Sequence, residues 1–140
     1  MNEIYFLGQL LVAIFLGAIL GWQRVSRGKP AGPRTYALVT AGATLFTVLS
    51  MYAFDLSDPS RVASQIVVGI GFLGAGIIFK REDHIEGLTT AAGLWMTAAI
   101  GMAVGVRYYI LAVGATLFIF LLLTLDDRRF KRKHTGGGER

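Results

Sequence analysis

Long apolar stretches alternate with short polar ones along most of the chain. Five stretches contain no Asp, Glu, Lys or Arg, and they cover residues 4–22, 35–54, 62–79, 89–106 and 108–125. A helix needs about 20 predominantly apolar residues to cross the ~30 Å hydrocarbon core of a bilayer, so each stretch is long enough. The pattern predicts an all-α membrane protein, with a five-span transmembrane domain at residues 1–127 and a basic cytoplasmic tail at residues 128–140.

The borders of these stretches carry residue types that begin or end helices. The expected first-turn and cap residues are Pro33 for the second helix, Ser57 or Asp58 with Pro59 for the third, and Thr89 for the fourth. Residues 88–125 contain one charge, Arg107, and would reach about 57 Å as a single helix at ~1.5 Å per residue. Because that length is nearly two bilayers, we expect the chain to turn at VGVRYY, residues 104–109.

The composition favours a membrane protein over a soluble helical one. Apolar residues make up 54% of the chain and charged residues 16%, and the mean hydropathy is +0.56. Five apolar helices without a polar face would have no surface suited to water. Residues 4–22 follow Glu3 instead of a basic segment, so we interpret them as a retained span and not as a signal peptide. The sequence contains no cysteine, which excludes disulfides and thiolate metal sites.

The basic residues indicate an orientation in the membrane, since cytoplasmic loops are enriched in Lys and Arg. In a five-span arrangement one side carries Arg24, Arg27, Lys29, Arg34, Lys80, Arg81, Arg128, Arg129, Lys131, Arg132, Lys133 and Arg140. The other side carries Arg61 and Arg107. This asymmetry predicts an N-terminus outside and a C-terminus in the cytoplasm, with the basic tail against anionic lipid.

Other functions find less support in the sequence. A net charge of +5 would suit nucleic acid, but no amphipathic element carries a basic patch. Gly69, Gly71 and Gly74 form a G-x-G-x-x-G pattern, but no strand precedes them, as a dinucleotide site requires. His84 lies near Glu82, Asp83 and Glu86, which suits either loose binding of a divalent cation or a solvated loop. We expect no enzyme, no cofactor and no nucleic-acid partner, and we leave Mg²⁺ open as a ligand.

Glycine recurs at helical spacing inside the predicted spans. The small residues expected at helix contacts are Gly17, Gly21, Gly69, Gly71, Gly74, Ala75, Gly101 and Gly105. In a bilayer, small residues at such spacing allow the backbones of two helices to approach closely. We therefore expect close helix packing within the chain and a homodimer or larger assembly.

Polar residues inside spans, or at their ends, are the candidates for a site, because they are costly in lipid and face the interior. The candidates are Gln23, Arg24, Arg34, Asp58, Arg61, Gln65, Glu86, Thr89, Thr90 and Trp95. In the functional interpretation, Arg24, Arg34, Thr89 and Thr90 converge in the cytoplasmic half of the bundle. Gln65 groups by topology with Asp58 and Arg61 nearer the outside, and the two groups form the two ends of one polar path. The structural interpretation is that Thr bonds its own helix, Gln makes one interhelical bond, Asp58 caps a helix and Trp95 packs.

Three segments carry the longest motifs of the chain, and they read GWQRVSRGKPAGPRTYALVTAGATLF, DPSRVASQIVVGIGFLGAGIIFK and EGLTTAAGLWMTAAIGMAVG. They resemble the MgtC/SapB family of bacterial and archaeal inner-membrane proteins. The resemblance implies a five-span domain with a cytoplasmic C-terminus, and a role in growth at low magnesium and survival inside macrophages. The motif positions that it carries over are Arg24, Pro30, Gly32, Arg34, Asp58, Arg61, Gln65, Gly71, Gly74, Thr89 and Thr90.

The chain departs from the family pattern at two charged positions. Gln23 stands where the family commonly has an acidic residue, and Glu86 stands where it has a basic one. Many members also carry a cytoplasmic regulatory domain after the last helix. We expect a protein that moves or senses a small cation or solute during adaptation to low magnesium or a related stress. The alternative is a non-transporting interaction protein that regulates another membrane complex, such as an ATP synthase.

Overall fold

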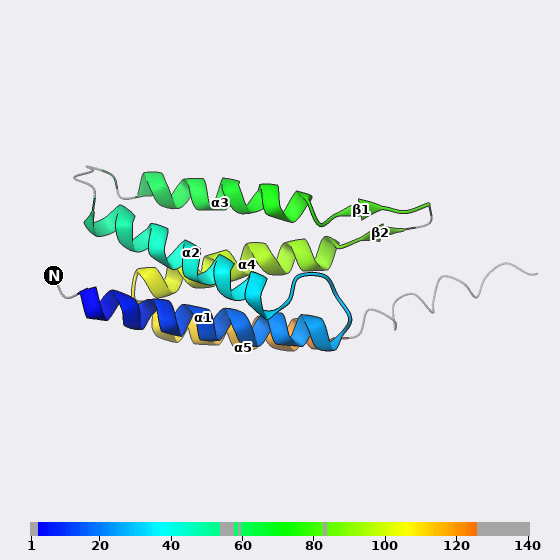
Figure 1. Ribbon diagram of the computed structural model, residues 1–140, viewed down its shortest axis with the longest axis horizontal. Coiled ribbons are helices and arrows are strands. Elements are labelled where there is room, and N and C mark those ends of the chain that lie inside the picture. Colours follow the sequence, from blue (N-terminus) through cyan, green and yellow to red (C-terminus); the bar gives the residue numbers. More distant parts are fainter. Residues whose placement is uncertain (1–2, 54–57, 59, 83, 126–140) are drawn as a thin grey trace, which may run out of the picture.

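Five helices lie side by side along a common direction, and a short two-stranded hairpin projects from one end (Figure 1). The computed structural model describes residues 3–53, 58, 60–82 and 84–125, so the predicted tail at 128–140 lies outside the described residues. The elements in chain order are α1 (Glu3–Ser26), α2 (Pro33–Tyr52), α3 (Ser60–Ala75), β1 (Phe79–Lys80), β2 (Ile85–Glu86), α4 (Leu88–Gly105) and α5 (Tyr109–Thr124). We call the end from which β1 and β2 project the hairpin end.

Two of the predicted helix borders are found in the structure. α2 begins at Pro33 with Gly32 as its N-cap residue, where the fixed φ of proline suits a first turn. The chain reverses between α4 and α5 through Arg107, whose φ of 66° lies in the left-handed region. The backbone N–H of Tyr108 donates to the Ala103 carbonyl at 2.8 Å and closes this turn. The predicted corner is therefore confirmed.

The third helix ends earlier than its apolar run. α3 stops at Ala75, and the N–H of Gly76 still donates to the Phe72 carbonyl at 3.2 Å. The chain then enters an antiparallel hairpin in which Phe79 pairs with Glu86. The prediction of a helix as far as residue 79 is wrong for its last residues. Turn hydrogen bonds from Ile77 and Ile78, and then strand pairing at Phe79, satisfy the backbone groups there instead.

Of the residues predicted to cap and begin α3, the structure describes Asp58. The carboxylate of Asp58 accepts hydrogen bonds from the backbone N–H of Ser60 at 2.9 Å and from its hydroxyl at 2.6 Å. These bonds favour the charged form and lower the pKa of Asp58. Ser57 and Pro59 lie outside the described residues. Asp58 thus makes the side-chain bond expected of a cap.

The cap predicted before α4 is wrong. The N-cap residue of α4 is Gly87 and not Thr89, and no side chain caps this helix. Gly87 has a φ of 88°, a conformation that glycine adopts without steric cost. The hairpin therefore leads into α4 through a left-handed glycine, and Thr89 lies within the first turn with its side chain exposed.

Close helix approach occurs at four predicted packing glycines, which are Gly17, Gly21, Gly101 and Gly105. A Cβ added at Gly17 on α1 would lie 2.6 Å from the Tyr36 carbonyl oxygen on α2. A Cβ added at Gly105 on α4 would lie 2.7 Å from the Cβ of Thr47 on α2. Both distances are shorter than van der Waals contact, so α2 lies between α1 and α4 at a spacing that only glycine permits.

The predicted packing residues of α3 behave differently. Gly74 faces Ala91 of α4, where an added Cβ would lie 3.5 Å from the alanine Cβ. An added Cβ at Gly69 or Gly71 would meet no atom within 4 Å, and Ala75 is exposed. Of all the α3 residues, only Ile70 and Gly74 are buried. The expected packing role of Gly69, Gly71 and Ala75 is therefore not fulfilled inside a single chain.

Many large apolar side chains face outward, while buried hydroxyl groups lie in the interior beside apolar residues such as Leu20 and Leu94. Ile110 is 92% exposed and Phe72 82%, whereas Thr40 and Thr97 are fully buried. This distribution suits a hydrocarbon environment, where burial of apolar groups gives helices little reason to associate. By length and composition, α1, α2 and α4 can cross a membrane, and α3 and α5 are shorter apolar helices.

Candidate functional site

Three helices bring polar side chains together at the hairpin end. Arg24 lies in the last turn of α1, and Thr90 lies in the first turn of α4. The Nη2 of Arg24 donates to the Thr90 hydroxyl at 2.7 Å, and the Tyr36 hydroxyl of α2 donates to the Thr90 carbonyl at 3.5 Å. Arg24 is 3% exposed, Thr90 1% and Tyr36 0%. We call these three residues the Arg24 cluster, which places a guanidinium group inside the bundle.

The positive charge of Arg24 has no carboxylate partner among the described residues. Their one ion pair joins Arg81 and Glu86 on the hairpin at 3.4 Å. The Nε of Arg24 is buried and makes no hydrogen bond within the described part of the chain. The guanidinium lies near the C-terminus of α1, whose partial negative charge offsets part of the cost of burial. Within the described part of the chain, the interior at the hairpin end therefore carries a positive charge without a carboxylate beside it.

Two glutamines of α1 bind the C-terminal carbonyls of α4 and α5. The Nε2 of Gln23 donates to the Leu123 carbonyl at 2.7 Å. The Nε2 of Gln9 donates to the Val104 carbonyl at 2.8 Å and to the Gly105 carbonyl at 3.1 Å. The last carbonyls of a helix have no partner within it, and an unpaired carbonyl is costly in lipid, so the bonds to the Gly105 and Leu123 carbonyls stabilise the helix ends. Gln23 thus makes the interhelical bond of the structural interpretation.

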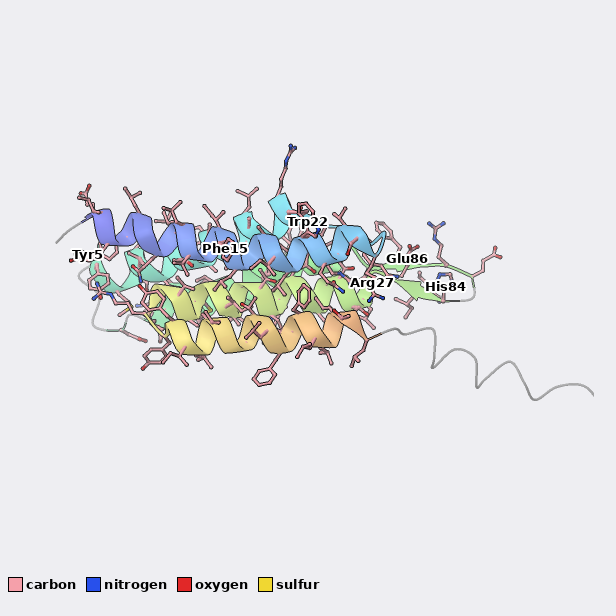
Figure 2. All side chains as sticks on the ribbon, turned by 90° about the horizontal axis from the view of Figure 1, so that it is seen from below. Tyr5, Phe15, Trp22, Arg27, His84 and Glu86 are labelled. Carbon is pink, nitrogen blue, oxygen red and sulfur yellow. The ribbon has the colours of Figure 1, made fainter. Side chains whose placement is uncertain are left out.

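The other candidate residues lie away from the Arg24 cluster. Those with exposed side chains are Arg34, Asp58, Arg61, Gln65, Glu86 and Thr89, together with Trp95, which is 46% exposed. Arg34 and Thr89 lie at the hairpin end but not inside it, so the expected convergence holds only for Arg24 and Thr90. Figure 2 shows Glu86 on the hairpin, beyond the end of the bundle, with Arg27 nearer the end of α1.

Buried hydroxyls in the bundle bond chiefly to their own helices. The residues that donate to the carbonyl four positions earlier include Thr40, Thr44, Thr47, Thr97 and Thr116. Thr44 also lies 2.8 Å from the Gly101 carbonyl of α4. Within the described residues, no three His, Asp or Glu side chains gather in a way that could hold a metal ion. These hydroxyls match the structural interpretation better than a polar path.

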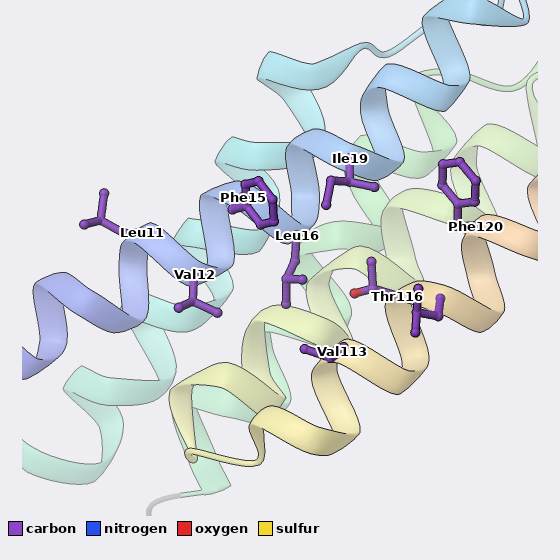
Figure 3. Close-up of a pocket in the computed structure, with 9 residues that line it drawn as sticks. Leu11, Val12, Phe15, Leu16, Ile19, Val113, Thr116 and Phe120 are labelled. Atoms are coloured by element: carbon purple, nitrogen blue, oxygen red, sulfur yellow. The ribbon is translucent and has the colours of Figure 1, made fainter.

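Two open grooves run along the outside of the bundle. One, of about 620 Å³, lies between α1 and α5 and is lined by apolar groups of Leu11, Phe15, Ile19, Leu117 and Phe120, among others (Figure 3). The second, of about 430 Å³, lies between α2 and α3 and contains Gln65 beside Gly42 and Gly69. Gln65 is the one candidate site residue that lines either groove.

Sequence reasoning missed Gln9, Tyr36 and Gly93. Gln9 has a visible signal, because it is a polar residue inside an apolar stretch and lies fourteen positions before Gln23, close to four helical turns. No pattern in the sequence identifies Tyr36 or Gly93. Their relation depends on α2 and α4 packing together, which brings the Tyr36 hydroxyl to 2.6 Å from a Cβ built on Gly93.

Comparison with known proteins gives a family and several relatives. The family model described as "MgtC family" matches residues 10–132. The "Putative magnesium transporter YhiD" of Escherichia coli (strain K12) is 48% identical over 122 residues, covering 81% of this chain and 56% of that protein. "Protein MgtC" of Brucella abortus (strain 2308) is 48% identical over 113 residues, covering 81% of this chain and 48% of that protein.

"Protein MgtC" of Salmonella typhimurium (strain LT2) is 46% identical over 110 residues, covering 79% of this chain and 47% of that protein. The chain therefore spans about half the length of the curated relatives that it matches. No solved structure matches the chain.

Proposed function

Because the chain belongs to the MgtC family, we propose that it is an inner-membrane protein of magnesium-related adaptation that regulates another membrane protein. On this proposal it has no catalytic activity of its own and does not conduct Mg²⁺ through its own bundle. The observation that carries the proposal is the buried charge of Arg24, which has no carboxylate partner among the described residues.

The charge of Arg24 makes the hairpin end unfavourable for a dication. At 4 Å and an effective dielectric constant of ~20, a guanidinium repels a divalent cation by roughly 8 kcal/mol. Cation paths through membrane proteins are lined by carboxylates or carbonyls that replace the ion's water. The described acidic residues are Glu3, Asp58, Glu82 and Glu86, and none of them lies in the interior of a helix. These features favour the regulatory function over transport.

The proposed arrangement has five spans, with the hairpin end in the cytoplasm. Among the described residues, the basic ones at or near that end are Arg24, Arg27, Lys29, Arg34, Lys80 and Arg81. Arg61 and Arg107 lie at the opposite end. Because positive charge accumulates on the cytoplasmic side of membrane proteins, this distribution supports an N-terminus outside and a C-terminus inside.

Magnesium transport is the second candidate, and the name of the E. coli relative favours it. The two candidates differ in liposomes that contain a magnesium-sensitive dye. We expect liposomes with the purified 140-residue chain to take up Mg²⁺ no faster than protein-free liposomes. Uptake above that background would overturn the regulatory proposal and support transport.

A growth assay tests the role of the Arg24 cluster. In a host that lacks its own family member, the chain should support growth at low magnesium, and Arg24→Leu should abolish this support. Arg34→Leu is the matched control, because Arg34 is exposed at the same end and makes no hydrogen bond among the described residues. Equal loss in both variants would argue against a specific role for the buried guanidinium.

A further inference from the structure

α3 is covered on one face only. Its two buried residues are Gly74, which faces Ala91 of α4, and Ile70, which packs in one cluster with Ala43 of α2 and Ala98 of α4. The neighbouring face forms the groove of about 430 Å³ with α2, which is lined by Leu38, Gly42, Phe46, Gln65, Gly69 and Leu73, among others. We call this the α2–α3 groove. A Cβ added at Gly42 or Gly69 would meet no atom within 4 Å, so the backbone is open to the surroundings at both glycines.

Gln65 is the polar group of the groove. Its side chain is exposed, and it makes no hydrogen bond within the described part of the chain. The sixteen residues of α3 extend about 24 Å at ~1.5 Å per residue, which is less than the ~30 Å core of a bilayer. Gln65 lies more than one turn inside this helix, so its amide lies at a depth where an unpaired polar group is costly.

We propose that a second copy of this chain occupies the α2–α3 groove, with the two Gln65 side chains bonded to each other across a two-fold axis. A primary amide has both donors and an acceptor, so two identical amides can each donate to the other. A two-fold interface brings the same surface of both copies together and therefore needs such self-complementary groups. Gly42 and Gly69 provide the close backbone approach that membrane helices use when they associate.

Gly69 and Gly71 point in different directions around α3, so a substitution at Gly71 is a control for the same substitution at Gly69. Gly69 and Gly71 are two residues apart, and at ~100° per residue they lie about 200° apart around the axis. Gly69 lines the groove and Gly71 does not. Each has open space around an added Cβ, so a larger side chain at either position is accommodated by the single chain. Gly69→Leu should prevent dimer formation, and Gly71→Leu should leave it unchanged.

The lack of cysteine makes cross-linking a clean test of the contact. Purified Gln65→Cys protein in lipid nanodiscs should form a disulfide-linked dimer on mild oxidation, because the two positions meet at the axis. Phe118→Cys on α5, where the native side chain is 75% exposed, is the control and should remain monomeric. Equal cross-linking of the two variants, or none at Gln65→Cys, would overturn the proposal.

Dimer affinity in detergent, measured by energy transfer between labelled copies, tests the amide pair. Loss of two reciprocal hydrogen bonds in Gln65→Leu should weaken dimerisation about tenfold. An unchanged dimer fraction in Gln65→Leu and Gly69→Leu, or a purified chain that is monomeric at all concentrations, would contradict the proposal and leave the groove to lipid or another protein. These results do not depend on Mg²⁺ uptake or growth, so failure here is distinguishable from failure of the proposed function.

Discussion

Gly101 lies where α4 crosses α2, and an added Cβ there would be 2.9 Å from the Ala43 Cβ and would collide with the Thr40 carbonyl oxygen. Backbone atoms cannot move aside without separating the two helices. We expect Gly101→Ala to lower the free energy of unfolding by about 2–3 kcal/mol, in the range of overpacked cores. Titration of the detergent-solubilised protein with SDS, followed by circular dichroism, measures this change.

Gly114 on α5 is the matched control, because an added Cβ there meets no atom within 4 Å. Gly114→Ala should be neutral or stabilising by up to about 1 kcal/mol, since alanine favours a helix over glycine. Equal destabilisation of both variants would show that the close contact of α2 and α4 at Gly101 is not the cause of the loss.

At the residue scale, sequence spacing identifies some contacts and cannot identify others. Gly17 and Gly101 are found because small residues repeat four positions apart, and both lie at helix contacts. Thr89 and Thr90 are adjacent and thus point about 100° apart, so only one of them can face Arg24. The sequence does not reveal which, because that depends on the rotation of α4 against its neighbours. For the same reason, the sequence does not reveal that Gly69 lines a groove and Gly71 does not.

At the element scale, the joint between the hairpin and α4 depends on Gly87. Its φ is 88°, and a side chain there would collide with the Ile77 carbonyl oxygen. Gly87→Ala should lower the free energy of unfolding by more than about 2 kcal/mol, because left-handed strain and a backbone clash add together. The same SDS titration measures it.

Gly28 separates the two contributions to that loss. It also has a positive φ, of 63°, but an added Cβ meets no atom within 4 Å. Gly28→Ala should therefore cost only the conformational term of about 1–2 kcal/mol. A loss in Gly87→Ala no greater than this would show that the hairpin moves away from α4 without cost.

The elements that the sequence predicts best are those whose borders carry a distinctive residue. Pro33 marks the start of α2, and the single charge Arg107 marks the turn after α4. The end of α3 has no such mark, since the apolar run continues through residues 76–79 after the helix has stopped. Apolar content alone cannot distinguish a helix from a strand, which is why the hairpin was not predicted.

At the scale of the whole molecule, the proposed topology places Asp58 outside the cell membrane and Glu82 in the cytoplasm. Both side chains are exposed at opposite ends of α3. In spheroplasts, a membrane-impermeant maleimide should label Asp58→Cys and not Glu82→Cys. Permeabilised cells provide the control, because both variants should then react. Labelling of both in intact spheroplasts would show that α3 does not cross the membrane.

The two glutamines of α1 fix the positions of two other helix ends relative to this helix. Gln9 holds the end of α4, and Gln23 holds the end of α5 at the hairpin end. One residue inserted between them would rotate one glutamine by about 100° relative to the other, so only one of the two attachments could persist. The fourteen-residue interval between the two glutamines should therefore tolerate neither insertion nor deletion, even at positions that face away from other helices.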